Sequence, residues 1–155
     1  MDIKILAVGS LDKPFLVTGC AMFLERTKHY AKIELIEVKE ITNKNEQVAI
    51  NEQTTLVTKK LLDYPDYYKV LLNINGQQLT SDKIAALIAD VKHFKKAKLM
   101  FIIGGSHGFN TAIQTEVAFQ LSFGAITLPH QLCRLILLEQ IYRGFKIINN
   151  EVYHK

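Results

Sequence analysis

Five short apolar runs alternate along the chain with longer segments of helical spacing. The runs predict buried strands, and they cover residues 3–8, 33–38, 69–74, 98–103 and the region beginning at 121–123. Between them, apolar side chains recur every three or four positions. This spacing predicts helices over residues 14–30, 49–62, 81–94 and 110–119, and a last one from Pro129 onward. Strands that alternate with helices indicate an α/β fold with a mainly parallel sheet flanked by helices.

Polar and turn-forming residues punctuate these elements. Residues 39–48 lack a clear period and are predicted to form a loop, and Tyr64-Pro65-Asp66 is typical of a turn. Asn75-Gly76 predicts a turn that closes the third strand. Thr80 opens a capping cluster before the third helix. Because no linker, repeat or low-complexity tract interrupts the pattern, we expect a single domain over residues 1–155.

Composition adds few constraints. Of 155 residues, 48% are hydrophobic, which is typical of a folded globular protein. No apolar run is long enough to predict a transmembrane helix, and the first ten residues fit a strand better than a signal peptide. We therefore expect a cytoplasmic protein without a membrane partner. Cys20 and Cys133 are far apart, which argues against a disulfide framework or a zinc site and favours two buried thiols.

The formal net charge is +4, a modest basic excess that is compatible with a nucleic-acid partner. Part of it lies in four lysines around the end of the third helix, at positions 92, 95, 96 and 98. Lysines at a helix carboxyl end also complement the helix dipole, so their position is explained without a ligand.

Three turns are expected at the carboxyl ends of the strands, where open α/β sheets place their ligand sites. They span residues 72–76, 104–108 and 123–128. The last of these is small and apolar, with one hydroxyl. Its backbone can wrap a flat ring such as adenine, although core packing alone would select similar residues. No metal-ligand spacing is present.

The turn Gly104-Gly105-Ser106-His107-Gly108 leaves two hypotheses open. Glycines after a strand permit a tight turn and close approach to a ligand. The same residues match G-x-S-x-G, so a serine hydrolase with Ser106 as its nucleophile is an alternative; its candidate partners are His130, His154, Glu116 and Glu139. Against this alternative, the candidate acids lie on predicted helices and no glycine-rich oxyanion segment is present.

The last helix and the tail carry further candidate chemistry. His130 and Arg134 lie one helical turn apart on one face, and Glu139 and Arg143 repeat the spacing of a surface ion pair. The chain ends on Tyr153, His154 and Lys155. Chain ends are often frayed, but this one can also reach a neighbouring subunit's pocket, where its rings would stack on a base.

Several runs together resemble the ribosomal RNA large subunit methyltransferase H family of the SPOUT superfamily. They are FIIGGSHGF, the long run LSFGAITLPHQLCRLILLEQIYRGFKI and the terminal YHK, supported by ILAVG near the start and LNINGQQLTS in the middle. The resemblance covers essentially the whole chain.

This resemblance implies a C-terminal trefoil knot, a homodimer and S-adenosylmethionine as the methyl donor, with no metal. It also implies methylation of N3 of a pseudouridine in large-subunit rRNA on the assembled ribosome. Tyr153 and His154 would approach the target base as catalytic residues. The cofactor would lie against Leu72, Gly104, Phe123, Gly124, Ala125, Ile126, Thr127 and Leu128. A non-catalytic RNA-binding module remains a further alternative.

Overall fold

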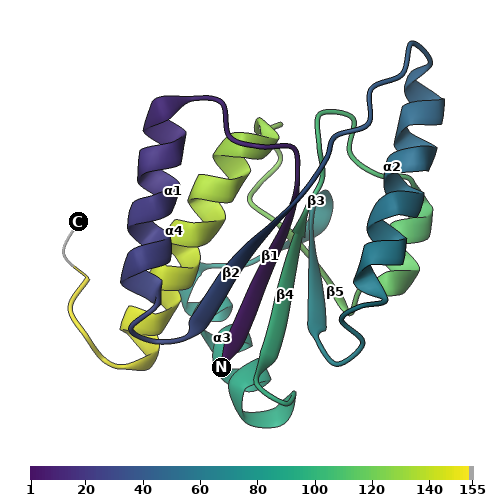
Figure 1. Cartoon of the computed structure of the whole chain (residues 1–155). Helices are drawn as coiled ribbons and strands as arrows, with labels where there is room; N and C mark the ends of the chain where they lie inside the picture. Colours follow the sequence, from purple (N-terminus) through teal and green to yellow (C-terminus); the bar gives the residue numbers. More distant parts are fainter. Residues whose placement is uncertain (154–155) are drawn as a thin grey trace.

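The predicted apolar runs pair into one parallel sheet in a computed structural model that describes residues 1–153 (Figure 1). The strands follow the order β2-β1-β4-β3-β5, and every neighbouring pair is parallel. They are β1 (Asp2–Val8), β2 (Lys32–Val38), β3 (Tyr68–Gln78), β4 (Lys98–Ile103) and β5 (Phe119–Ser122). The predicted α/β architecture with a parallel sheet is confirmed.

The strands β1 and β4, in the middle of the sheet, are mostly apolar because helices cover both of their faces. In β1, Ile3 and Ile5 belong to one hydrophobic cluster, whereas Leu6 and Val8 belong to the other. All four side chains are fully buried. The sheet therefore separates two cores, and its carboxyl edge is the place where polar loops emerge.

Three helices cover one face of the sheet and one covers the other (Figure 1). On the first face lie α1 (Pro14–Thr27), α3 (Ser81–Phe94) and α4 (His130–Ile148). On the second face, α2 (Glu46–Leu61) packs beside a short 3₁₀ helix, η1 (Thr111–Glu116). The α2 helix begins within the stretch that we predicted to be a loop. Its start is fixed by Asn45, whose side chain accepts a hydrogen bond from the amide of Val48 at 3.3 Å.

The predicted helix over residues 110–119 is wrong. Only η1 forms there, because Val117 is already extended and Phe119 pairs with Val70 as the first residue of β5. Asn110 caps the short helix by accepting a hydrogen bond from the amide of Ala112 at 3.0 Å. Strand pairing thus overrides the helical spacing.

The turn predicted at Asn75-Gly76 is also wrong, because β3 continues through these residues to Gln78. The strand is irregular there: Leu72 and Gln77 both pair with Leu121, so residues 73–76 bulge out of the ladder. A Cβ on Gly76 would lie 2.7 Å from the carbonyl oxygen of Gln120. The glycine therefore serves a close backbone approach instead of a chain reversal.

Three further expectations have different outcomes. Cys20 is buried, but Cys133 is only half-buried, so the prediction of two buried thiols is half right. Across residues 1–153, none of the helices combines the length and apolar character needed to cross a bilayer. The trefoil knot and the single-domain assignment stay predictions.

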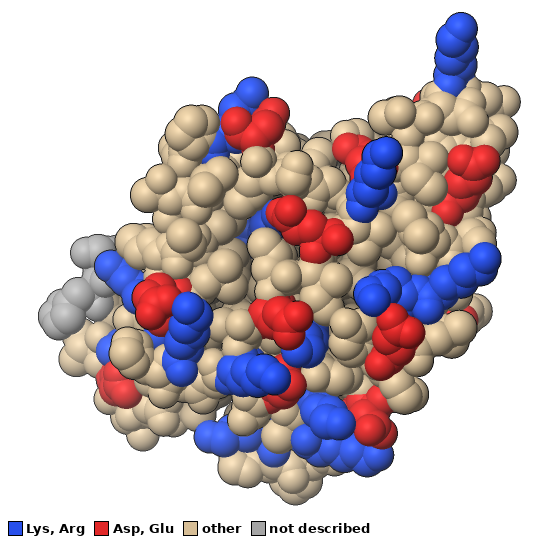
Figure 2. Space-filling model, in the orientation of Figure 1, with Lys and Arg blue, Asp and Glu red and all other residues tan. Residues whose placement is uncertain are grey.

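Acidic side chains interrupt the basic groups on the surface. Figure 2 shows Lys and Arg gathered at the lower edge, near the amino ends of the strands, with Asp and Glu between them. Asp66, just before β3, lies 2.6 Å from the Lys96 ammonium and 3.3 Å from that of Lys98. Both lysines are thereby partly neutralised, and this face carries no uniform positive patch.

Candidate functional site

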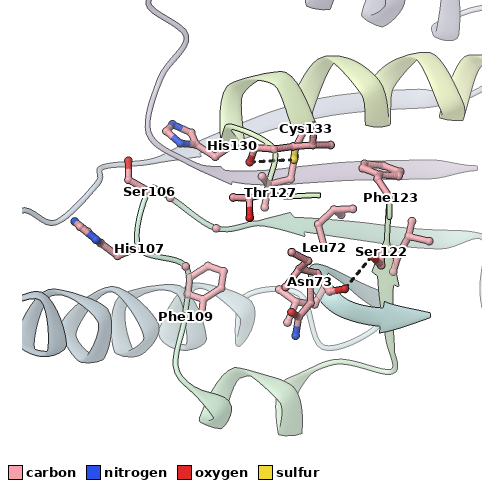
Figure 3. A pocket seen from close by; sticks show the side chains of 18 of the residues that line it. Leu72, Asn73, Ser106, His107, Phe109, Ser122, Phe123, Thr127, His130 and Cys133 are labelled. Atoms are coloured by element: carbon pink, nitrogen blue, oxygen red, sulfur yellow. Dashed lines mark hydrogen bonds between the residues drawn. The ribbon is translucent and has the colours of Figure 1, made fainter. Parts of the chain in front are cut away.

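A cavity of about 790 Å³ opens beside the bulge of β3, the carboxyl ends of β4 and β5 and the start of α4 (Figure 3). This volume lies within the range of pockets that hold small molecules and cofactors. The three turns predicted at this edge contribute to its wall. From the set predicted to hold a cofactor, the lining includes Leu72, Gly104, Phe123, Gly124, Ile126, Thr127 and Leu128, whereas Ala125 is not among the lining residues.

We call the wall neutral because no permanently charged side chain of the described residues lines it. Among the described residues that line the cavity there is no Asp, Glu, Lys or Arg. The titratable side chains in the lining are His107, His130 and Cys133. Burial raises the pKa of the Cys133 thiol, so this side chain is uncharged at neutral pH. Such a wall offers a ligand apolar surface and uncharged hydrogen-bonding groups, from the backbone and from amide and hydroxyl side chains.

Hydrogen bonds tie two of the turns to each other. The hydroxyl of Ser122 lies 3.0 Å from the carbonyl oxygen of Ile74 and accepts a bond from the amide of Gly124 at 3.2 Å (Figure 3). In the same bulge, the amide nitrogen of the Asn73 side chain donates to Gln120 at 2.7 Å. The bulge of β3 and the 123–128 turn therefore form one connected wall.

The glycine turn after β4 is packed against its own downstream residues. A Cβ on Gly104 would lie 3.2 Å from both the Cα of Gly108 and the ring of Phe109. Gly108 has a φ of 69°, a conformation that glycine adopts without strain. The turn is tight because Gly104 packs against the downstream residues Gly108 and Phe109. Gly104 also lines the cavity.

His130 and Arg134 separate in role, although they share a face of α4. His130 lines the cavity, whereas Arg134 is fully buried beneath it. The Arg134 guanidinium donates to Glu37 at 2.5 Å and to the carbonyl oxygen of Gly9 at 2.8 Å. Arg134 thus ties α4 to the ends of β1 and β2 and is a structural residue.

The model of a protein family described as "Predicted SPOUT methyltransferase" matches residues 1–154. This chain belongs to the SPOUT methyltransferase family. Three proteins named ribosomal RNA large subunit methyltransferase H are similar to it over 100% of both chains. The protein from Mycoplasma mycoides is 43% identical, that from Carboxydothermus hydrogenoformans 41% and that from Listeria monocytogenes 37%. A putative RNA methyltransferase of the TrmH family from Porphyromonas gingivalis superposes with a TM-score of 0.40 and 11% identity, covering 89% of this chain and 58% of its own.

The serine hydrolase hypothesis has no support in this SPOUT methyltransferase chain. The amide of Ser106 donates to the Glu40 carboxylate at 2.6 Å, and His107 lies 3.4 Å from Glu46. Among residues 1–153, none of the histidines forms a hydrogen bond with the Ser106 hydroxyl. The histidine base that this hypothesis requires is therefore not in place beside Ser106.

Tyr153 does not approach the cavity of its own chain. Its hydroxyl donates to Glu139 at 2.7 Å, and the Arg143 guanidinium lies 4.0 Å from its ring centroid. Burial and the bond to Glu139 raise the pKa of the Tyr153 hydroxyl, so the phenol is neutral at physiological pH. The Glu139–Arg143 pair predicted as a surface contact is thus part of a site that holds the tail. His154 lies outside the described residues.

Sequence reasoning missed part of the cavity wall. Asn110, Ile113 and Gln114 line the side opposite α4, and they come from the segment wrongly predicted as a regular helix. No sequence signal indicated them. Asn73 and Ile74 also line the cavity, and both fall within the turn predicted over residues 72–76.

Proposed function

We propose that this methyltransferase transfers a methyl group from S-adenosylmethionine to N3 of a pseudouridine in large-subunit rRNA, on the assembled ribosome. The observation that carries the proposal is the meeting of the β3 bulge and two strand-end turns at one neutral cavity in a SPOUT family chain. Full-length relatives with 37% to 43% identity are named ribosomal RNA large subunit methyltransferase H, which supports an rRNA substrate. A ribosomal substrate implies a cytoplasmic location.

The cavity residues suit an adenosine-bearing donor. Leu72 and Phe123 offer apolar surface for a flat ring, and the 123–128 turn offers backbone N–H and C=O groups to its edge. We assign Gly104, Gly124, Ile126, Thr127 and Leu128 to the same binding wall. The bound donor supplies an electrophilic methyl group on a sulfonium, so alignment of the target nitrogen provides much of the rate.

The tail is assigned to the target base. Because Tyr153 is held on α4 away from its own cavity, we propose a homodimer in which the tail of one subunit completes the pocket of the other. His154, or a water that it holds, would accept the N3 proton of the pseudouridine. Replacing His154 by Ala should abolish methylation and leave donor binding unchanged; methylation at the normal rate would exclude His154 as the proton acceptor.

Labelled donor and ribosomes from a strain that lacks the modification test the proposal. We expect the label at N3 of one pseudouridine of the large subunit, and label elsewhere or none at all would refute it. Calorimetric titration with S-adenosylmethionine distinguishes the alternative of a non-catalytic RNA-binding module, which predicts no heat of binding. Ser106→Ala should methylate at close to the normal rate, whereas a serine hydrolase would lose its activity.

A further inference from the structure

We infer that Glu40, on the segment after β2, is a positioning residue that sets the shape of the glycine turn in the cavity wall. Its Oε1 accepts a hydrogen bond from the amide of Ser106 at 2.6 Å. Gly104, Gly105 and Ser106 all line the cavity, whereas Glu40 does not. The inference rests on the proposed function, because it takes the cavity to be the binding site of the methyl donor.

The backbone around Glu40 is itself fixed to α2. The amide of Ile41 donates to the side-chain oxygen of Gln53 at 2.7 Å, and the Gln53 amide nitrogen lies 3.4 Å from the carbonyl oxygen of Lys39. Gln53 is a buried polar residue with 4% of its surface exposed. Since both neighbours of Glu40 are held, its carboxylate has a defined place above the turn.

The turn is shaped to receive this carboxylate. A Cβ on Gly105 would lie only 2.5 Å from the Glu40 Oε1 and 2.8 Å from a methyl group of Val8. A Cβ on Gly9 would lie 3.6 Å from the other carboxylate oxygen. A larger residue at 105 would therefore displace the Glu40 carboxylate from its present place, whereas the sequence alone suggested that the glycines served the ligand.

The charge of Glu40 strengthens the contact. Burial pushes the pKa of this carboxyl upward, but hydrogen bonds from Ser106 and the nearby imidazoles of His130 and His107 outweigh it, and the pKa lies below its usual range. The carboxylate is ionised at neutral pH, and a hydrogen bond to an ionised acceptor is stronger than one between neutral groups.

Other contacts hold the far end of the turn. The amide of Asn110 donates to the Thr54 hydroxyl at 3.1 Å, and the Asn110 side chain donates to Asn51 at 2.9 Å. Between this anchor and the end of β4, Glu40 provides a fixed point in the middle. Pre-ordering of the turn lowers the entropic cost of ligand binding, so losing Glu40 should weaken donor affinity more than the chemical step.

The test compares Glu40→Ala, Glu40→Gln and the control Glu46→Ala in the full-length protein. Glu46 is an exposed carboxylate beside the same turn that contacts the side chain of His107 instead of a backbone amide. Calorimetry should show S-adenosylmethionine binding about tenfold weaker in Glu40→Ala, the size expected for one lost hydrogen bond to a charged group. The kcat at saturating donor should stay within about twofold of wild type. Glu40→Gln keeps an acceptor oxygen and should recover most of the affinity, and Glu46→Ala should resemble wild type.

A second readout is independent of activity. Hydrogen exchange in the ligand-free protein should be faster across residues 104–109 in Glu40→Ala than in wild type or Glu46→Ala, at equal unfolding temperature. Unchanged exchange and affinity in Glu40→Ala would overturn the inference, as would a Gln variant as weak as the Ala variant. A wild-type protein that fails to bind the donor would instead refute the proposed function, and the exchange data would still test the role of Glu40.

Discussion

The contact between the buried Arg134 guanidinium and the partly exposed Glu37 carboxylate leads to a quantitative prediction. Glu37→Gln removes the negative charge and leaves a fully buried guanidinium that still donates to the carbonyl oxygen of Gly9. The Nε of Arg134 has no hydrogen-bond partner among the described residues. This atom therefore provides no contact that would compensate for the loss of the Glu37 charge. Breaking a buried ion pair from one side costs about 3–5 kcal/mol.

The expected cost is lower because the Glu37 side chain is 41% exposed and water reaches the pair from that side. We therefore expect Glu37→Gln to lower the free energy of unfolding by about 2–3 kcal/mol. For a chain of this length, that corresponds to a fall in Tm of roughly 4–12 °C. This is a large fraction of the stability of a typical domain, which is about 5–15 kcal/mol.

Urea unfolding of a double-mutant cycle measures the pair directly. Glu37→Gln and Arg134→Met are made singly and together, at one fixed protein concentration because the midpoint of the proposed homodimer would depend on it. The double variant should lose clearly less free energy of unfolding than the two single variants lose together. The reason is that Glu37→Gln should change the stability little once the guanidinium has been removed. A coupling below about 0.5 kcal/mol, the usual error of additivity, would refute the reasoning.

Three further predictions concern single positions. Gly76→Ala should destabilise the fold by about 1–3 kcal/mol in urea unfolding, because the added Cβ would press on the Gln120 carbonyl; an unchanged midpoint would contradict the reported bulge. Asn45→Ala should cost about 1 kcal/mol through loss of the cap on the Val48 amide, and Asn45→Asp, which keeps an acceptor, is the control. The pKa of Glu40 is lowered on folding, although burial opposes this, so its stabilising contribution exists above the ordinary value of 4.5 and is lost as the pH falls through the folded pKa. The stability difference between wild type and Glu40→Gln should therefore shrink between neutral and strongly acidic pH, and a constant difference would exclude this linkage.

The sequence predicted the central strands well because burial on both faces leaves a simple signal. The apolar run over residues 98–103 is the whole of β4, and both of its faces are covered. The errors arose where a tertiary contact overrides a local preference. Asn75-Gly76 is typical of a turn, but β3 continues through both residues. Gly76 is needed there because the Gln120 backbone leaves no room for a Cβ. Residues up to Phe119 were predicted to be helical, yet Phe119 pairs with Val70 of β3, and Val117 before it is already extended.

The site was predictable to the extent that strand ends define it. Parallel strands bring their carboxyl ends to one edge, so the convergence of the turns at 104 and 123 follows from the fold class. The bulge inside β3 brings Leu72 to the same cavity and does not follow from strand ends. Contacts between side chains and distant backbone groups were not predictable. The reach of Glu40 to Ser106 spans 66 positions, and that of Arg134 to Gly9 spans 125. The hydrogen bond from Tyr153 to Glu139 on α4 was equally unpredictable.

The neutral wall of the cavity has a practical consequence for separating the two halves of the proposed reaction. Mobile ions screen attraction between exposed charges, and protein contacts to phosphates weaken steeply as salt rises. A small molecule held by backbone amides and apolar side chains should lose little affinity under the same conditions. A high salt concentration should therefore release the enzyme from ribosomes while the methyl donor stays bound. Stepwise dilution of the salt would then restart methylation from enzyme that already holds its donor.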